Sequence, residues 1–193
     1  MKIEPTKKNG LIAVLVAVIL VLLGMQFAGD HNGMSHMGTT SNNTSEFSSN
    51  DVMFAQMMIP HHQQAVEMSD LAISISTNED VLALARQIKA AQDPEITQMK
   101  GWLTAAGASL TMDHDMGMDG MLSDEEIAAL SKATGSEFDR LFLSGMIAHH
   151  EGALSMVSMI EDSENSEARK LAAEIKSSQS AEIELMKGFL KTL

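Results

Sequence analysis

The chain has 193 residues and a formal net charge of −13, which argues against nucleic acid or an anionic membrane surface as a partner. It contains 17 methionines and seven histidines but no cysteine, so disulfides and thiolate metal ligands are excluded while thioether and imidazole ligands remain. Aromatic residues make up only 4% of the chain, and the abundance of Ala, Leu, Met, Glu and Lys favours helices over an all-β fold.

The first predicted element is an apolar segment near the N-terminus. Residues 11–28 read LIAVLVAVILVLLGMQFA, without a charge, and residues 1–10 before them carry three lysines. An apolar run of about 18 residues can span a bilayer, and a basic flank stays in the cytoplasm. A cleaved signal peptide, which would give a secreted protein, has a shorter apolar core and small residues at the cleavage site, and Gln26 and Phe27 fit that poorly. We therefore predict a transmembrane anchor that holds the rest of the chain outside the cytoplasm.

A segment with little apolar surface follows the anchor. Residues 29–48 consist mainly of Gly, Ser, Asn and Thr, so they cannot form a core of their own and are predicted to be a flexible tether. Within the tether, HNGMSHM gathers thioethers and imidazoles at short spacing. Its candidate metal ligands are His31, Met34, His36 and Met37.

The rest of the chain is an internal duplication. MIPHHQQAVEM at residues 58–68 recurs as MIAHHEGALSM at residues 146–156. IKAAQDPEITQMKGWL at residues 88–103 recurs as IKSSQSAEIELMKGFL at residues 175–190. In each segment the apolar positions advance by alternating steps of three and four residues, which places them on one face of a helix.

Two repeats of two helices predict an all-α domain over residues 49–193, a four-helix bundle built from two helical hairpins. The hairpins comprise residues 49–107 and 136–193. Residues 108–135 between them hold a methionine-rich linker and then a short extra helix, which we expect to begin with a capping box and to end at Gly135. Two prolines inside the first hairpin should kink its helices without ending them, because the apolar period continues past both.

Halfway along each predicted helix the apolar positions give way to polar ones. His61 and His62 lie as far before the turn at residues 77–80 as Gln92 and Glu95 lie after it, so the two pairs should face each other across the hairpin. The second copy repeats this pattern with His149, His150, Gln179 and Glu182.

Two interpretations of these polar positions remain open. Each buried imidazole needs hydrogen-bond partners, and a facing carboxylate or amide would supply one and fix the register of the helices. Alternatively the histidine pairs bind a metal, together with the methionines that flank them on the same helices. Those methionines, which by themselves would be ordinary core residues, are Met58, Met68, Met146 and Met156.

The linker between the repeats carries the strongest indication of a soft metal. Residues 111–122 read TMDHDMGMDGML, rich in Asp and Gly, with no apolar face against which methionines would pack. Thioether and imidazole ligands without a thiol or an oxygen cage suit Cu(I) or Ag(I). The candidate ligands in this linker are Met112, His114, Met116, Met118 and Met121.

Calcium is the competing ion at this linker. Residues 115–126 match an EF-hand calcium loop at its first, fifth, sixth and twelfth positions. Gly117, however, stands at the third position, where an oxygen ligand is expected, and a capping box already accounts for Glu126. The sequence therefore disfavours Ca²⁺.

The doubled M-I-x-H-H pattern, the Q-x-x-E-I-x-x-M-K-G-[WF]-L ending of each repeat and the methionine-rich linker together resemble the family named domain of unknown function 305. The resemblance covers residues 49–193. It implies a ferritin-like helical bundle and, for the copper-binding members of the family, binding of copper and silver in metal resistance. On this resemblance the two histidine pairs and their flanking methionines are the expected ligands.

The predicted function is therefore binding of Cu(I) or Ag(I) outside the cytoplasm, for buffering or for transfer to an acceptor protein, without catalysis. Two alternative functions compete with it. A ferritin-like, metal-dependent oxidoreductase would combine the histidines with Glu95, Glu182 and Glu151. A helical protein-interaction domain would bind metal only incidentally.

Overall fold

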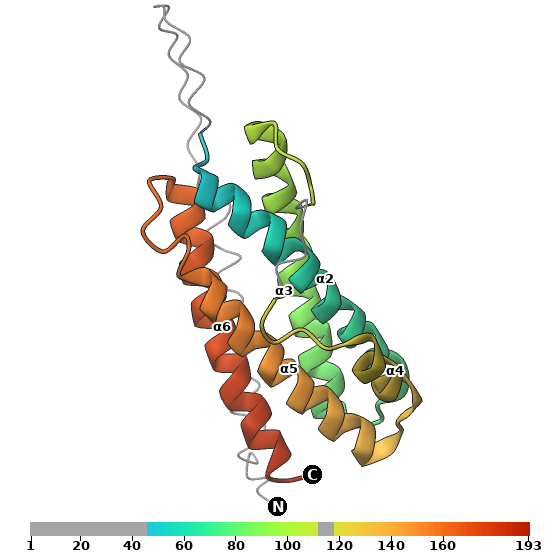
Figure 1. The fold of residues 1–193 in the computed structure, drawn as a ribbon. Coiled ribbons are helices and arrows are strands. Elements are labelled where there is room, and N and C mark those ends of the chain that lie inside the picture. Colours follow the sequence, from blue (N-terminus) through green and yellow to red (C-terminus); the bar gives the residue numbers. More distant parts are fainter. Residues whose placement is uncertain (1–45, 112–117) are drawn as a thin grey trace, which may run out of the picture. The chain divides into compact units, whose positions relative to one another are not determined.

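The computed structural model describes residues 46–111 and 118–193. Across these residues the chain is helical and contains no strand, which confirms the predicted all-α class. No helix in the described part is long and apolar enough to cross a membrane, and the predicted anchor at residues 11–28 lies outside it. Figure 1 shows the helices of the described residues, which are α2 (Ser49–Ile75), α3 (Glu79–Ala106), α4 (Asp124–Lys132), α5 (Gly135–Val157) and α6 (Ser166–Leu190).

The four long helices form the two predicted hairpins. Helices α2 and α3 pack along each other, as do α5 and α6. At each turn an asparagine caps the second helix: the side chain of Asn78 accepts a hydrogen bond from the Asp80 amide at 3.0 Å, and that of Asn165 accepts one from the Glu167 amide at 2.8 Å. These caps satisfy amides that lack a partner in the first turn of a helix. The turns thus fall where the sequence predicted them.

The ends of the other elements also follow local chemistry. Helix α2 continues through Pro60 and α3 through Pro94, so neither proline ends a helix. Gly107 closes α3 in the left-handed region, with φ of +65°. The prediction that the short extra helix ends at Gly135 was wrong. Helix α4 stops at Lys132, and Gly135, with φ of +60°, is the first residue of α5.

The predicted capping box opens α4. The backbone amide of Ser123 donates to a carboxylate oxygen of Glu126 at 2.8 Å, and the Ser123 hydroxyl donates to the same oxygen at 2.9 Å. These bonds hold the pKa of Glu126 below its ordinary value. Farther along α4, Leu130 is fully buried and packs into the core beneath α5.

Buried apolar residues form two separate clusters. The first core cluster draws on segments 47–59, 96–103 and 153–175, and the second on segments 65–88, 130–146 and 183–186. Each cluster therefore receives residues from all four long helices. Each of the four long helices has a segment between the two clusters that contributes to neither. Eight polar residues occupy these segments, and we call them the polar layer: His61, His62, Gln92, Glu95, His149, His150, Gln179 and Glu182.

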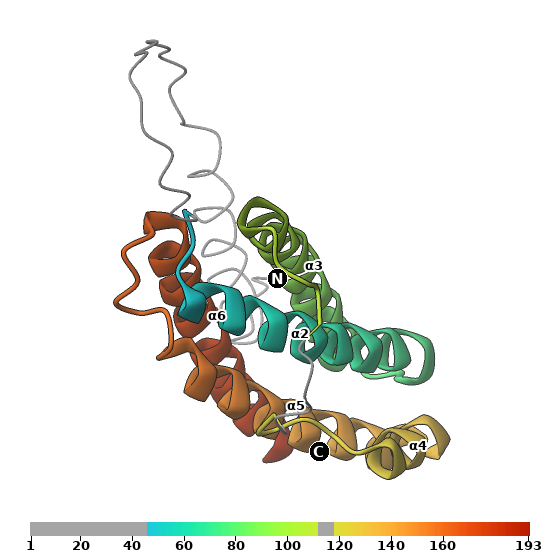
Figure 2. The same ribbon diagram turned by 45° about the horizontal axis from the view of Figure 1, so that its top comes forward.

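The hairpins meet chiefly along α2 and α5. The first half of α2 and the second half of α5 contribute to the same core cluster, which shows that these two helices run antiparallel. Figure 2 shows α3 beside α2 and α6 beside α5. Two long side chains bridge α3 and α6. Gln87 donates to Glu182 at 3.2 Å, and the Trp102 indole donates to Glu167 at 3.3 Å.

Candidate metal centre

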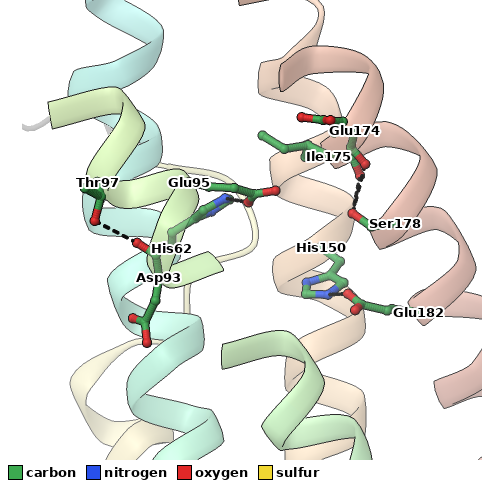
Figure 3. Close-up of polar contacts among 9 residues, drawn as sticks. All are labelled: His62, Asp93, Glu95, Thr97, His150, Glu174, Ile175, Ser178 and Glu182. Carbon is green, nitrogen blue, oxygen red and sulfur yellow. Dashed lines mark hydrogen bonds and ion pairs between the residues drawn. The ribbon is translucent and has the colours of Figure 1, made fainter. Parts of the chain in front are cut away.

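Each hairpin holds one histidine–glutamate pair. His62 Nε2 lies 2.7 Å from Glu95 Oε2, and His150 Nε2 lies 2.8 Å from Glu182 Oε2. The two pairs occupy equivalent positions of the repeat and appear side by side in Figure 3. The prediction that histidine and glutamate face each other across each hairpin is confirmed.

The other two histidines meet between the hairpins. The rings of His61 and His149 lie with their centroids 3.8 Å apart and their planes inclined by 39°. These two residues occupy equivalent positions in the two repeats, so each half of the duplication contributes the same histidine to the contact. Sequence periodicity did not predict this contact.

Burial keeps both of these rings neutral near pH 7. Desolvation is the main cause that lowers the pKa of His61 to about 3, and the neighbouring His62 lowers it further. The pKa of His149 is also lowered well below its ordinary value, first by burial and then by His61 and His150. The His61 backbone has a smaller, opposite effect and raises the pKa of His149. Neither nitrogen of His149 has a hydrogen bond of ordinary geometry. A neutral imidazole is the form that binds metals.

Seven buried polar atoms of the layer lack a hydrogen-bond partner. They are the Nδ1 atoms of His61, His62, His149 and His150, the Nε2 atom of His149, and the Oε1 atoms of Gln92 and Gln179. Each such atom destabilises the fold by about 1–3 kcal/mol unless something binds to it. Their concentration in one layer makes this layer the candidate site for a ligand.

The two histidine–glutamate pairs have the geometry of metal-binding histidines. Because a carboxylate only accepts, Nε2 of His62 and of His150 carries the proton, and Nδ1 is the nitrogen without a hydrogen-bond partner. Histidine ligands in proteins commonly donate their second nitrogen to a carboxylate or a backbone carbonyl in this way. In both pairs Nδ1 has no hydrogen-bond partner, which is the arrangement of such a ligand before it binds.

The methionines that flank the histidines lie in the apolar core. Met58 and Met156 are buried in the first core cluster, whereas Met68 and Met146 are buried in the second. They therefore lie on both sides of the polar layer. Their burial fits the expected role of core residues, and thioether ligation by them stays a prediction.

The methionine-rich linker returns to the polar layer. Met118 is half-buried against the first core cluster, so the expectation that linker methionines have nothing to pack against was wrong for this residue. Met121 is also half-buried, and between the two the backbone oxygen of Asp119 lies 3.3 Å from His61 Nε2. The linker and the layer, predicted as separate sites, are contiguous. The other predicted ligands lie outside the described residues: His31, Met34, His36, Met37, Met112, His114 and Met116.

Oxygen-rich metal sites have less support. Within residues 46–111 and 118–193 no group of three or more His, Asp or Glu side chains is arranged to hold a metal ion, and this includes the histidines of the polar layer. Glu151, which the oxidoreductase alternative requires, lies at the surface with its carboxylate 3.7 Å from Lys187. Glu126 of the calcium alternative is occupied by its capping box, and Asp115 lies outside the described residues.

The residues that attach the linker to the helices were not predicted from the sequence. Gln64 bonds to Leu122, and Gly152 leaves room for the backbone of Asp119. These two residues occupy equivalent positions of the repeat and are among those at which its copies differ. The difference between the two copies at this position was therefore the feature of the sequence that could have indicated these two residues.

A family model described as "Domain of unknown function (DUF305)" matches residues 51–190. The chain belongs to the DUF305 family. A DUF305 protein of Streptomyces coelicolor, described as a candidate secreted protein, has a similar structure with a TM-score of 0.71, 32% identity, and coverage of 75% of this chain and 93% of that one. A DUF305 fragment from Deinococcus radiodurans gives a TM-score of 0.71 and 32% identity, covering 76% of this chain and 99% of that one. No curated protein matches the chain.

Other DUF305 structures similar to this chain are those of CopM. The Cu(I)-bound form of CopM has a TM-score of 0.63 and 34% identity over 74% of this chain and 96% of that one. The Ag-bound form obtained by soaking has a TM-score of 0.62 and 34% identity, covering 74% and 95%. CopM also has a Cu(II)-bound structure of similar resemblance.

Proposed function

We propose that this DUF305 protein binds Cu(I) or Ag(I) in its polar layer, on a ferritin-like four-helix scaffold. The observation that carries the proposal is the pair of buried histidines whose Nε2 atoms are held by glutamates while their Nδ1 atoms are free. The likeness to CopM in its Cu(I)- and Ag-bound forms supports the same class of ligand.

The donor set favours a soft monovalent ion over a hard one. The available atoms are imidazole nitrogens, with thioethers close to the layer in both core clusters, and there is no thiol in the chain. Glu95 and Glu182 are already bonded to histidines, so few oxygen ligands remain for calcium or for a di-iron centre. Monovalent copper and silver also tolerate a low coordination number, which suits two or three donors.

We further propose that the protein stores or transfers the ion outside the cytoplasm, without turnover. The predicted anchor at residues 11–28 would hold the helical domain at the membrane, and a family member described as a candidate secreted protein is consistent with an extracytoplasmic place. An acceptor protein would receive the metal. An oxidoreductase would instead consume a reductant or oxidant in the presence of bound copper, which a carrier does not.

The experiment that tests this proposal is a Cu(I) titration of the full chain, purified in mild detergent under reducing conditions, against a colorimetric Cu(I) chelator. A double variant, His62→Gln with His150→Gln, should lose at least tenfold in affinity, because the substituted side chains lack the free Nδ1. The variant Met53→Leu, at an exposed methionine, is the matched control and should bind as the natural protein does. Equal affinity of the double variant and the control would exclude the polar layer as the site.

The contribution of the linker is measured separately. A variant with leucine at Met112, Met116, Met118 and Met121 keeps the size of each side chain but removes its sulfur. If the linker thioethers share in binding, this variant should take up fewer Cu(I) ions per chain. Unchanged uptake would confine binding to the rest of the molecule.

A further inference from the structure

Both described ends of the methionine-rich linker are attached to the same stripe of α2. Gln56 donates a hydrogen bond from its side chain to the Ser109 carbonyl oxygen at 2.8 Å, where the linker begins. Gln64 donates to the Leu122 carbonyl oxygen at 2.8 Å and accepts from the Leu122 amide at 2.8 Å. These glutamines are eight residues apart, or about 12 Å along the helix.

The returning end of the linker also lies directly on α5. A side chain at Gly152 would overlap the carbonyl oxygen of Asp119, and a side chain at Gly120 would overlap the carbonyl oxygen of Ala148. Gly120 has φ of +83°, a conformation that favours glycine. Two glycines therefore allow the linker backbone to touch the helix backbone, where any larger residue would push them apart.

This seating brings one backbone oxygen to the polar layer. The Asp119 carbonyl lies 3.3 Å from His61 Nε2 and, being only an acceptor, requires the proton of the ring to be on Nε2. The Nδ1 atom of the ring then has no hydrogen-bond partner. In His61 a backbone carbonyl therefore accepts the hydrogen bond from Nε2, as the glutamates do for His62 and His150, and Nδ1 again has no partner.

The arrangement is asymmetric between the two halves. His149 is the repeat equivalent of His61, yet neither of its nitrogens has a hydrogen-bond partner. At the equivalent positions 64 and 152, one half supplies the amide that holds the linker and the other supplies the glycine that admits it. The contact with His61 therefore comes from the linker and is not repeated in the second half of the duplication.

We propose that Gln64 is a positioning residue for the metal centre: by holding Leu122, it seats Asp119 against His61 and fixes the His61 ring with Nδ1 free to bind the ion. This inference rests on the proposed function for its consequence on affinity, but its structural part concerns the metal-free protein. Gln56 holds the opposite end of the linker and plays no direct part in orienting the ring.

The test compares three variants of the full chain in mild detergent. Gln64→Leu removes both hydrogen bonds to Leu122, whereas Gln64→Glu keeps an acceptor for the Leu122 amide and loses the donor to its carbonyl. Gln63→Leu makes the same change as the first variant at the adjacent, exposed position and is the matched control. Because Gln64→Glu alters the site less, it keeps the test decisive if Gln64→Leu folds poorly.

Two readouts need no metal. In the natural protein the Leu122 amide should exchange slowly with solvent, and ¹⁵N NMR should show His61 protonated at Nε2 alone. In Gln64→Leu the Leu122 amide should exchange at least tenfold faster and His61 should populate both tautomers, with a smaller effect in Gln64→Glu and none in Gln63→Leu. Persistence of the slow exchange and of the single tautomer in Gln64→Leu would overturn the proposal.

The third readout is affinity for Ag⁺ and Cu(I), which should fall about tenfold in Gln64→Leu, the lower end of the range for lost support of a metal ligand. If His61 loses its tautomer while affinity stays unchanged, Gln64 positions the ring but not the metal centre, and the proposal fails. If the natural protein binds neither ion, the proposed function fails, while the exchange and tautomer results still decide whether Gln64 seats the linker.

Discussion

Two neutral histidines in contact at the centre of the molecule make its stability depend on pH. His61 has a pKa of about 3 when folded, against an ordinary value of 6.5, and the pKa of His149 is also lowered. Between these values the unfolded chain binds more protons than the folded chain, so protonation favours unfolding. The stabilising effect of the neutral rings is fully present above pH 6.5 and is lost as the pH falls toward 3.

This predicts a specific difference between the natural protein and His61→Gln. On lowering the pH from 7.5 to 4.5, the natural protein should lose about 2–3 kcal/mol of unfolding free energy more than the variant, which cannot titrate at this position. Urea unfolding of both proteins at the two pH values measures the difference. The same loss in both would mean that His61 is not held neutral by the fold.

The glutamates that hold His62 and His150 should control metal affinity without binding the metal themselves. Glu95→Gln and Glu182→Gln each replace a charged hydrogen bond with a neutral one, so the imidazole becomes a weaker donor to a cation. We expect Ag⁺ affinity to fall about 10-fold in each variant, measured by competition with a chelator. Glu184→Gln, at an exposed carboxylate on α6, is the control and should leave affinity as it is. A fall as large in the control would point to the general negative charge of the domain and not to the pairs.

At the scale of elements, the close contact between the linker and α5 depends on the absence of a side chain at Gly152 as well as at Gly120. Gly152→Ala should reduce stability by about 1–3 kcal/mol, because its methyl group would overlap the Asp119 carbonyl. Gly188 on α6 has no atom within contact distance of an added methyl group, so Gly188→Ala should increase stability by about 0.5–1 kcal/mol through a better helix propensity. Thermal unfolding of the two variants measures both effects. A neutral or stabilising Gly152→Ala would show that the linker is not seated on α5.

The elements themselves were largely predictable, because local chemistry determines where they begin and end. Asparagines, a capping box and Gly107 mark helix ends in the sequence and do so in the structure. Gly135 misled because a glycine with positive φ can stand at either end of a helix, and here it begins α5 while α4 already ends at Lys132.

At the scale of the whole molecule, the duplication made the polar layer predictable. Positions equidistant from a hairpin turn lie at the same level, and this brought His62 to Glu95 and His150 to Glu182. Which histidines meet between the hairpins was not predictable, since His61 and His62 point about 100° apart on the helix and the packing of α2 on α5 selects one of them. The seating of the linker was also beyond reach, because it depends on Gln64 and Gly152, where the repeat is broken.

The most direct test of the account is an ¹⁵N NMR titration of the full chain with Ag⁺, following the ring nitrogens of the four histidines in the polar layer. We expect the Nδ1 signals of His62 and of His150 to shift in proportion to added silver, while the Nε2 signals, from atoms bonded to glutamate, shift little. Ring signals that stay unchanged through a full equivalent of silver would contradict the account, whether or not the ion binds elsewhere on the chain.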